Sequence, residues 1–110
     1  MPLDETAYAQ QVSKAFKRLM AALDSVDPDL LESESTGDMV TVTAPANGQK
    51  VIVNTQRAVK QLWVAGGGQG IHFDFDLASA TWQDDKGKGK ELFAWVAECV
   101  QAISGQQLQF

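Results

Sequence analysis

The chain contains one cysteine and one histidine in its 110 residues, and both scarcities exclude classes of protein. A single cysteine, Cys99, cannot form an intrachain disulfide. With His72 as the one histidine, no Ser/His/Asp or Cys/His arrangement is apparent, and no buried pair of carboxylates stands out either. We therefore do not expect an enzyme with an active site of its own.

Long apolar stretches are absent as well. No run of hydrophobic residues reaches membrane-spanning length, and residues 1–5 lack the basic start and apolar run of a signal peptide. The sequence therefore predicts a cytoplasmic protein that does not bind membranes. A hydrophobic content of 45% argues against disorder, and the length suits a single domain over residues 1–110. The net charge of −5 argues against nucleic acid as a partner.

Lysine and arginine are missing from residues 24–38, which we call the acidic segment. Residues 39–110, by contrast, carry six acidic and six basic side chains. Crowded like charges repel one another and destabilise the compact state. The acidic segment therefore predicts contact with a metal ion or with a basic protein, and a solvated acidic surface is the alternative. Its carboxylates are Asp24, Asp27, Asp29, Glu32, Glu34 and Asp38.

Only oxygen atoms are available as metal ligands in this segment. Asp24 and Asp27 are three residues apart and are expected to share a face of the last helical turn. Glu32 and Glu34 share a face of the first strand, and Asp29 lies in the loop between. Such a shallow row suits hard cations such as iron, manganese or calcium without dictating a closed coordination shell, so we expect weak binding with modest selectivity. The spacing does not continue into the third ligand and glycine of an EF-hand.

Apolar residues at steps of three and four predict a helix near each end of the chain. The first begins after Asp4, a suitable N-cap, and is stopped by Pro28. The second is closed by Gly105. The expected apolar stripes are Tyr8, Val12, Phe16, Leu19, Leu23 and Val26 in the first helix, and Leu92, Val96, Cys99 and Ile103 in the second.

Between the helices the hydrophobic period changes to two, which is typical of strands. Strands are expected around residues 31–35, 40–43, 50–53, 61–65 and 71–76 and at Trp82, and their short connections favour antiparallel pairing. The sequence therefore predicts an α+β protein, a two-layer α-β sandwich. Both terminal helices would pack on one face of an antiparallel sheet of five to six strands.

The alternation also predicts where Trp63 points. If Leu62 and Val64 face the helices, Trp63 faces the other way, because successive strand side chains point to opposite faces. His72 and Asp74 are expected on the same outer face. A large aromatic residue on an open sheet face favours a protein interface. The alternative is that Trp63 lies flat over its neighbours and stabilises the sheet.

Residues 54–65 read Asn-Thr-Gln-Arg-Ala-Val-Lys-Gln-Leu-Trp-Val-Ala. They resemble the signature of the frataxin family, bacterial CyaY type: Asn-x-Gln-x-Pro-x-x-Gln-(Ile/Val/Leu)-Trp-(Leu/Val)-(Ala/Ser). A Gly-Ile-His-Phe-Asp element at 70–74, a strand tryptophan at Trp82 and the acidic segment match as well, in order and spacing, so the resemblance covers nearly the whole chain. The sequence departs from the family at Ala58, where the pattern has a proline, and the acidic segment is thinner than in many relatives.

This resemblance implies a frataxin-like sandwich that serves as an iron-binding regulator or iron chaperone of iron–sulfur cluster assembly. It implies weak binding of ferrous or ferric iron by the six carboxylates of the acidic segment, and no organic cofactor. The implied partners are the cysteine desulfurase and the iron–sulfur scaffold machinery, met by a mostly monomeric protein. The sheet contacts would come from Trp63, Asn54, Gln56 and Gln61.

Two other interpretations stay open beside this one. The protein is, alternatively, a purely protein-binding acidic regulator of the desulfurase for which metal binding is incidental. A ferroxidase is a weaker idea, because it would need a di-iron cage and the sequence has no Glu-x-x-His motif.

Three further features have mainly structural interpretations. A lone histidine on a sheet face, such as His72, is more often a packing residue than a ligand. Cys99 lies on an apolar helical stripe and is expected to be a buried, inert thiol. The three lysines of residues 86–90 could hold an anion at the start of the second helix, although lysines on a turn are usually solvated.

Overall fold

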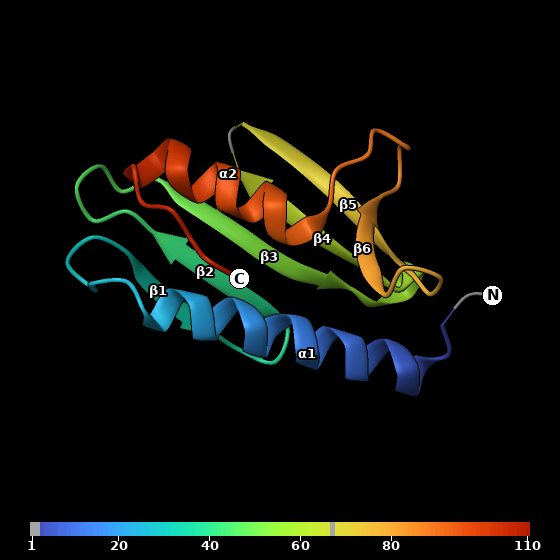
Figure 1. Ribbon diagram of the computed structural model, residues 1–110. Coiled ribbons are helices and arrows are strands. Elements are labelled where there is room, and N and C mark those ends of the chain that lie inside the picture. The colour runs from blue at the N-terminus through green and yellow to red at the C-terminus, as the bar shows by residue number, and fades with distance from the viewer. Residues whose placement is uncertain (1–2, 67) are drawn as a thin grey trace.

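The computed structural model describes residues 3–66 and 68–110, and over these residues two α-helices flank a meander of six strands (Figure 1). A 3-10 turn, η1 (Arg57–Val59), separates the third strand from the fourth. The elements in chain order are α1 (Glu5–Asp24), β1 (Glu32–Ser35), β2 (Met39–Thr43), β3 (Lys50–Gln56), β4 (Gln61–Gly66), β5 (Gln69–Asp76), β6 (Thr81–Asp84) and α2 (Leu92–Ser104).

The strands form one sheet in the order β1-β2-β3-β4-β5-β6, with every neighbouring pair antiparallel. Both helices lie against the same face of this sheet (Figure 1). The predicted α+β sandwich is therefore confirmed, with six strands. Neither helix in the described ranges is long and apolar enough to cross a membrane.

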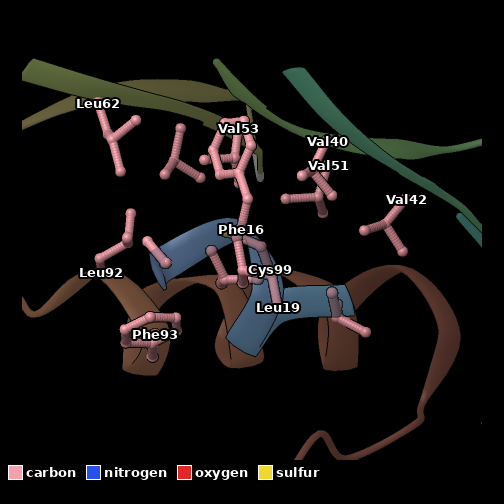
Figure 2. Packing of buried hydrophobic residues seen from close by; sticks show 14 of the residues in the cluster. Phe16, Leu19, Val40, Val42, Val51, Val53, Leu62, Leu92, Phe93 and Cys99 are labelled. Carbon is pink, nitrogen blue, oxygen red and sulfur yellow. The ribbon is translucent and has the colours of Figure 1, made fainter. Parts of the chain in front are cut away.

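The core lies between the helices and the sheet (Figure 2). Alternate residues of the central strands point into it, and Val53, Leu62 and Val64 are fully buried there. Burial of each such side chain contributes about 1.5–3 kcal/mol relative to leaving it exposed. The predicted stripes of both helices meet these residues, with Leu19, Leu92 and Val96 also fully buried. Val26, expected at the end of the first stripe, lies beyond α1 and is only partly buried against the core. The alternation and the helical period thus predicted the same core.

The helix ends agree in part with the prediction. Asp4 caps α1, since its Oδ1 accepts a hydrogen bond of 2.7 Å from the N–H of Ala7, and Gly105 closes α2 with a φ of 74°. However, α1 ends at Asp24, four residues before Pro28, because the Ser25 N–H and hydroxyl both turn back to the carbonyl of Ala22.

Close packing joins the end of β4 to α2. A Cβ atom placed on Gly66 would lie 2.9 Å from the Sγ atom of Cys99, so only glycine lets strand and helix approach this closely. Cys99 is buried, and this burial raises the pKa of its thiol to about 11. The thiol is therefore protonated at neutral pH, as expected for an inert packing residue.

Candidate functional site

Between α1 and β1, residues 25–31 of the acidic segment form a turn that is anchored in the core. The N–H groups of Leu30 and Leu31 donate to the carbonyl of Asp27, at 2.9 and 3.1 Å. The side chain of Asp27 accepts the N–H of Asp29 at 2.9 Å. Leu31 is buried in the main core, whereas the carboxylate-bearing residues around it are exposed. One apolar side chain thus fixes a short segment whose charges face solvent.

The prediction that Asp24 and Asp27 share a helical face was wrong. Asp24 is the last residue of α1, and Asp27 lies beyond the helix in the turn. Glu32 and Glu34, in contrast, lie on one side of β1 as predicted, opposite Thr43 and Thr41. Within residues 3–66 and 68–110, no three His, Cys, Asp or Glu side chains gather into a group that could hold a metal ion.

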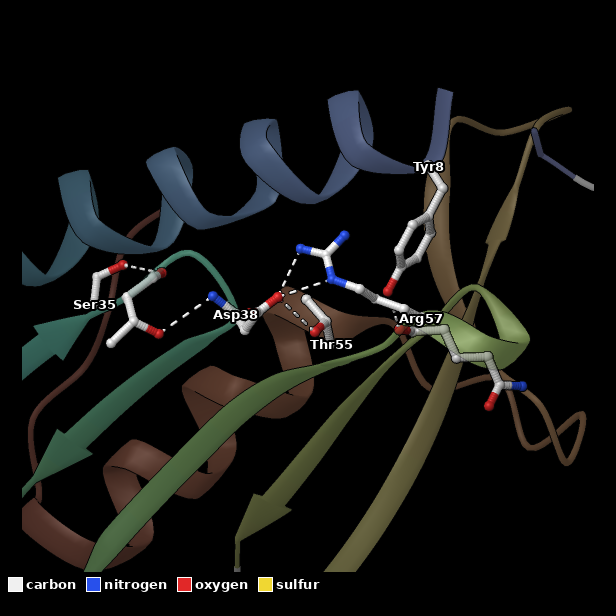
Figure 3. Close-up of polar contacts among 7 residues, drawn as sticks. Tyr8, Ser35, Asp38, Thr55 and Arg57 are labelled. Carbon is white, nitrogen blue, oxygen red and sulfur yellow. Dashed lines mark hydrogen bonds and ion pairs between the residues drawn. The ribbon is translucent and has the colours of Figure 1, made fainter. Parts of the chain in front are cut away.

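Asp38 differs from the other carboxylates because it has a cationic partner (Figure 3). Arg57 donates to its Oδ1 atom from Nε at 2.9 Å and from Nη2 at 2.6 Å. The hydroxyl of Thr55 donates to the same oxygen at 3.1 Å, and the Thr55 N–H donates to the Asp38 carbonyl. The Arg57 hydrogen bonds, and next the Thr55 hydroxyl, hold the pKa of the Asp38 carboxyl below its ordinary value.

The partnership between Asp38 and Arg57 was missed at the sequence level. The acidic segment has no cation of its own, but Arg57 reaches it across the β2–β3 hairpin. The sequence did hold a signal for this pair, since Asp38 immediately precedes β2 and Arg57 immediately follows β3. In an antiparallel hairpin the start of the first strand lies beside the end of the second. Finding it required the register of the two strands. The Asp38 carboxylate is therefore already paired with Arg57, and it is the weakest candidate among the six predicted metal ligands.

The sheet face away from the helices, which we call the outer face, collects the predicted partner-binding residues. Asn54 pairs with Trp63 across β3 and β4, and Trp63 pairs with His72 across β4 and β5. Gln56 pairs with Gln61 in the next outward-facing row. All five side chains are partly exposed, while Leu62 and Val64 are fully buried on the other face. The predicted orientation of Trp63 is confirmed.

Trp63 packs along the sheet rather than standing free of it. A Cβ atom on Gly70 would lie 2.5 Å from the indole Nε1 atom, so the ring covers this glycine. The Trp63 and His72 rings stack with centroids 6.2 Å apart and planes inclined by 29°. A flat indole over a glycine shields the backbone of the neighbouring strand. Trp63 thus stabilises the sheet with one face of its ring and leaves part of its surface open.

Hydrogen bonds orient the amide side chains beside Trp63. Gln56 Nε2 donates to Asn54 Oδ1 at 3.3 Å, and Gln61 Nε2 donates to Asp74 Oδ1 at 3.0 Å. From the helix side, the Tyr8 hydroxyl donates to the Gln61 carbonyl at 2.7 Å. The turn between β3 and β4 is thereby tied to α1, and the outward amides are held in a defined arrangement.

The side of β1 that carries Glu32 and Glu34 is continuous with the outer face. Glu34 points to the same side as its partner Thr41, and Thr41 pairs in turn with Ile52 of β3. Three strand spacings separate β1 from β4, which places Glu34 roughly 15 Å from the Trp63 strand. A protein partner could therefore contact the β1 carboxylates and Trp63 together.

The lysine-containing loop after β6 does not form an anion site at the start of α2. Glu91 caps this helix, and its carboxylate accepts the N–H groups of Phe93 and Ala94. The loop itself closes around Asp84, whose carboxylate accepts the N–H groups of Lys86, Lys88 and Lys90 at 3.1, 2.8 and 2.7 Å. These hydrogen bonds, foremost that of Lys88, lower the pKa of the Asp84 carboxyl.

Replacing Asp84 by asparagine is expected to lower the melting temperature at pH 7, because a neutral amide is a weaker acceptor for the three N–H groups. Since the folded-state pKa of Asp84 is depressed, its stabilisation is complete above the unfolded-state pKa of about 3.9 and is lost as pH falls through the lower folded-state value. The gap in melting temperature between wild type and Asp84→Asn should therefore shrink below about pH 5. Thermal melts over a pH series measure it.

The adjacent carboxylate provides the control for this prediction. Asp85 is exposed and accepts the Gln61 amide instead of the loop N–H groups, so Asp85→Asn should have a smaller effect at every pH. If the gap for Asp84→Asn were constant down to the lowest pH, the charge of Asp84 would not be what holds the loop.

Known proteins are similar to this chain over nearly its whole length. The family model described as a frataxin-like domain matches residues 1–106. The iron-sulfur cluster assembly protein CyaY of Cupriavidus metallidurans is 37% identical over 112 residues, covering 98% of this chain and 90% of the relative. The protein of the same name from Stutzerimonas stutzeri is 34% identical over 112 residues, covering 100% and 97%.

A solved structure supports the architecture independently. The frataxin from Psychromonas ingrahamii superimposes with a TM-score of 0.85 over 97% of each chain, at 20% sequence identity. At this level of identity the likeness establishes the fold alone.

Proposed function

This chain belongs to the frataxin-like family, in its bacterial CyaY type, and from this premise we propose that it acts in iron–sulfur cluster assembly as a non-enzymatic regulator. Its partner is the cysteine desulfurase of the assembly machinery, with the scaffold protein close by in the same complex. The relatives named above carry the name of iron–sulfur cluster assembly proteins. In this proposal the protein works in the cytoplasm, whose reducing conditions suit its free thiol at Cys99.

The observation that carries this proposal is that Glu32 and Glu34 of β1 lie on the same side of the sheet as Trp63. Asp38 is the one carboxylate with an ion-pair partner among residues 3–66 and 68–110. Glu32 and Glu34 are therefore available to form ion pairs with a basic surface of a partner. Trp63 offers the partner an aromatic surface beside oriented amide groups. Such a combination of charge at the rim and an aromatic anchor nearer the centre is typical of protein interfaces.

The two β1 carboxylates allow a matched test. Glu32→Gln/Glu34→Gln should weaken binding to a cysteine desulfurase by about 2- to 30-fold, since each exposed ion pair contributes roughly 0.2–1 kcal/mol. Isothermal titration calorimetry at low salt measures this change. Glu5→Gln/Glu98→Gln removes the same charge from exposed glutamates of the two helices and should leave the affinity within about twofold of wild type. Equal losses in both variants would indicate only a net-charge effect.

A second function, iron carriage, is favoured by the same carboxylates. Asp24, Asp27, Asp29, Glu32 and Glu34 are all exposed, and their oxygens suit iron. Because no preformed shell holds the ion, affinity should be weak, roughly tens of micromolar or poorer. In this form of the proposal the protein delivers iron while it is docked; in the other form, metal binding is incidental to docking.

Paramagnetic iron is expected to broaden the amide resonances of the acidic segment first. Broadening should begin at residues 24–34, and Asp38 should respond later, because Arg57 already occupies one of its oxygens. Nuclear magnetic resonance titration of the labelled protein under anaerobic conditions measures this order. Glu32→Gln/Glu34→Gln should reduce the effect, and Glu5→Gln/Glu98→Gln should not. Broadening centred on His72 or on residues 84–98 would show that the metal binds elsewhere.

A further inference from the structure

The loop of residues 85–90, which we call the lysine loop, is held in place mainly by hydrogen bonds of its backbone. The three N–H groups that bind Asp84 belong to the backbone of Lys86, Lys88 and Lys90. The Asp84 N–H also donates to the Lys90 carbonyl at 3.0 Å. The backbone therefore fixes the loop, and the ammonium groups of Lys86 and Lys88 are left for another role, whereas that of Lys90 packs on the Trp95 ring.

Beside this loop, β5 continues past the end of β6 (Figure 1). The four residues of β6 pair with 73–76 of β5, so residues 69–72 have no β6 residue opposite them. The lysine loop lies along this part of β5, and the Asp85 N–H donates to the His72 carbonyl at 2.9 Å. A pocket of about 180 Å³ lies between them, lined by Gln69, Gly70, Ile71, His72, Asp84, Asp85, Lys86, Lys88 and Lys90.

Polar groups of β5 in this pocket are not fully used. The Nδ1 atom of His72 is buried and has no hydrogen-bond partner, although buried polar atoms are almost always paired. The stack against Trp63 holds this ring in position. Because alternate residues of an antiparallel strand direct their backbone groups to the same side, Gly70 directs its N–H to the same edge as His72. The Gly70 N–H can donate to a ligand oxygen; the buried His72 Nδ1 atom can do so only after the ring turns about its Cβ–Cγ bond.

The charges of the lining favour an anion. Lys86, Lys88 and Lys90 form no ion pair within the described part of the chain, and the Lys90 ammonium lies 4.5 Å from the ring centroid of Trp95. The two carboxylates of the lining are already engaged, Asp84 by the loop N–H groups and Asp85 by the amide of Gln61. Lys86 and Lys88 are therefore left without a partner in the described part of the chain, and the three lysines of the lining outnumber its two carboxylates, so the pocket favours an anion.

We propose that this pocket binds a phosphate group, either as free phosphate or as the phosphate of a small monoester. Its volume lies below the roughly 300–1,000 Å³ of pockets for drug-sized ligands, so the ligand is small. The lysines supply the charge, and the backbone of Gly70, with His72 once its ring has turned, supplies directed hydrogen bonds. The loop between β6 and α2 lies at the other end of the molecule from the turn between α1 and β1 (Figure 1), so this proposal is independent of desulfurase docking through Glu32 and Glu34.

The probe is inorganic phosphate, titrated into the metal-free labelled protein at constant ionic strength, with amide shifts as the readout. Saturable shifts are expected at Gly70, at His72 and along the lysine loop, with a dissociation constant in the range of about 1 mM. A parallel titration with glycerol 3-phosphate distinguishes the two sources, because the tighter of the two ligands identifies free phosphate or a monoester as the occupant.

Matched variants decide whether the lysine loop is the cause. Lys86→Gln/Lys88→Gln/Lys90→Gln keeps every backbone contact to Asp84 and should weaken phosphate binding at least about tenfold. Lys14→Gln/Lys17→Gln/Lys50→Gln removes the same charge elsewhere and should leave the affinity within about twofold. His72→Phe keeps an aromatic ring against Trp63 without its nitrogens, and it should weaken binding while the lysines are intact.

The single variant Lys88→Gln serves if the triple variant does not fold, since Lys88 is exposed. Absence of saturable shifts in the wild-type protein would overturn the proposal. Equal losses in the two triple variants, or shifts spread evenly over all lysines, would do so as well, because they would indicate unspecific attraction.

Discussion

Replacing Leu62 by alanine is expected to lower the free energy of unfolding by about 2–5 kcal/mol. Leu62 has no exposed surface, and it lies between Thr55 of β3 and Phe73 of β5 on the core side of the sheet. Truncation removes its transfer free energy and leaves a cavity that the surrounding strands and helices can only partly fill. Equilibrium denaturation with urea measures the loss, and the slope of the transition shows whether unfolding remains two-state.

The neighbouring residue provides the control for this effect. Trp63→Ala should cost clearly less stability than Leu62→Ala, because the outer face is open and no enclosed cavity forms. Some loss is expected, since the indole covers Gly70 and stacks on His72. If Trp63→Ala destabilised the fold as much as Leu62→Ala, the assignment of Leu62 to the core face and of Trp63 to the outer face would be wrong.

The second large effect concerns binding. Trp63→Ala should weaken the affinity for the cysteine desulfurase by about 2 kcal/mol or more, roughly 30-fold, because an aromatic anchor in an interface typically contributes this much. Calorimetric titration of the folded variant measures it. Leu77→Ala is the matched control, since Leu77 is an exposed hydrophobic residue in the turn after β5 and should change the affinity little.

Normal binding by a folded Trp63→Ala variant would assign Trp63 to packing alone. The docking surface would then consist of the acidic segment without the sheet. This outcome would keep the role of Glu32 and Glu34 but remove that of the aromatic residue.

The fold was predictable because its two signals are local. Helical stripes such as Tyr8 to Leu23 and alternating pairs such as Leu62 and Trp63 depend only on backbone geometry, and each predicts which side faces the core. The six-stranded meander then follows from short loops. The length of β3 was not predictable in the same way, since it continues through polar Asn54 and Gln56, whose strand conformation depends on pairing with β4.

The site was less accessible to sequence reasoning, because its decisive contacts are long-range or use the backbone. The pair of Asp38 and Arg57 depends on the register of a hairpin. Asp84 did not stand out in the sequence, because its hydrogen-bond partners are three backbone N–H groups, which residue identity does not reveal. The error over Asp27 has a local cause, because Ser25 ends α1 one turn before the proline that was expected to stop it.

The acidic segment shows the difference most clearly. Its charge was plain from composition, but charge alone left a solvated surface as an alternative to contact with a metal ion or a basic protein. The strand register adds that Glu32 and Glu34 share a continuous face with Trp63, and our proposal of a protein partner rests on this. The inference that the segment carries no compensating cation needed the correction that Arg57 supplies one to Asp38.

The most direct test of the central claim, that the protein itself docks on the desulfurase through this surface, is a calorimetric titration of the desulfurase with and without ferrous iron. The account predicts binding in the absence of iron, a loss of about 2- to 30-fold for Glu32→Gln/Glu34→Gln, and little change for Glu5→Gln/Glu98→Gln. Binding that occurs only when iron is present, or that is insensitive to Glu32 and Glu34, would contradict it.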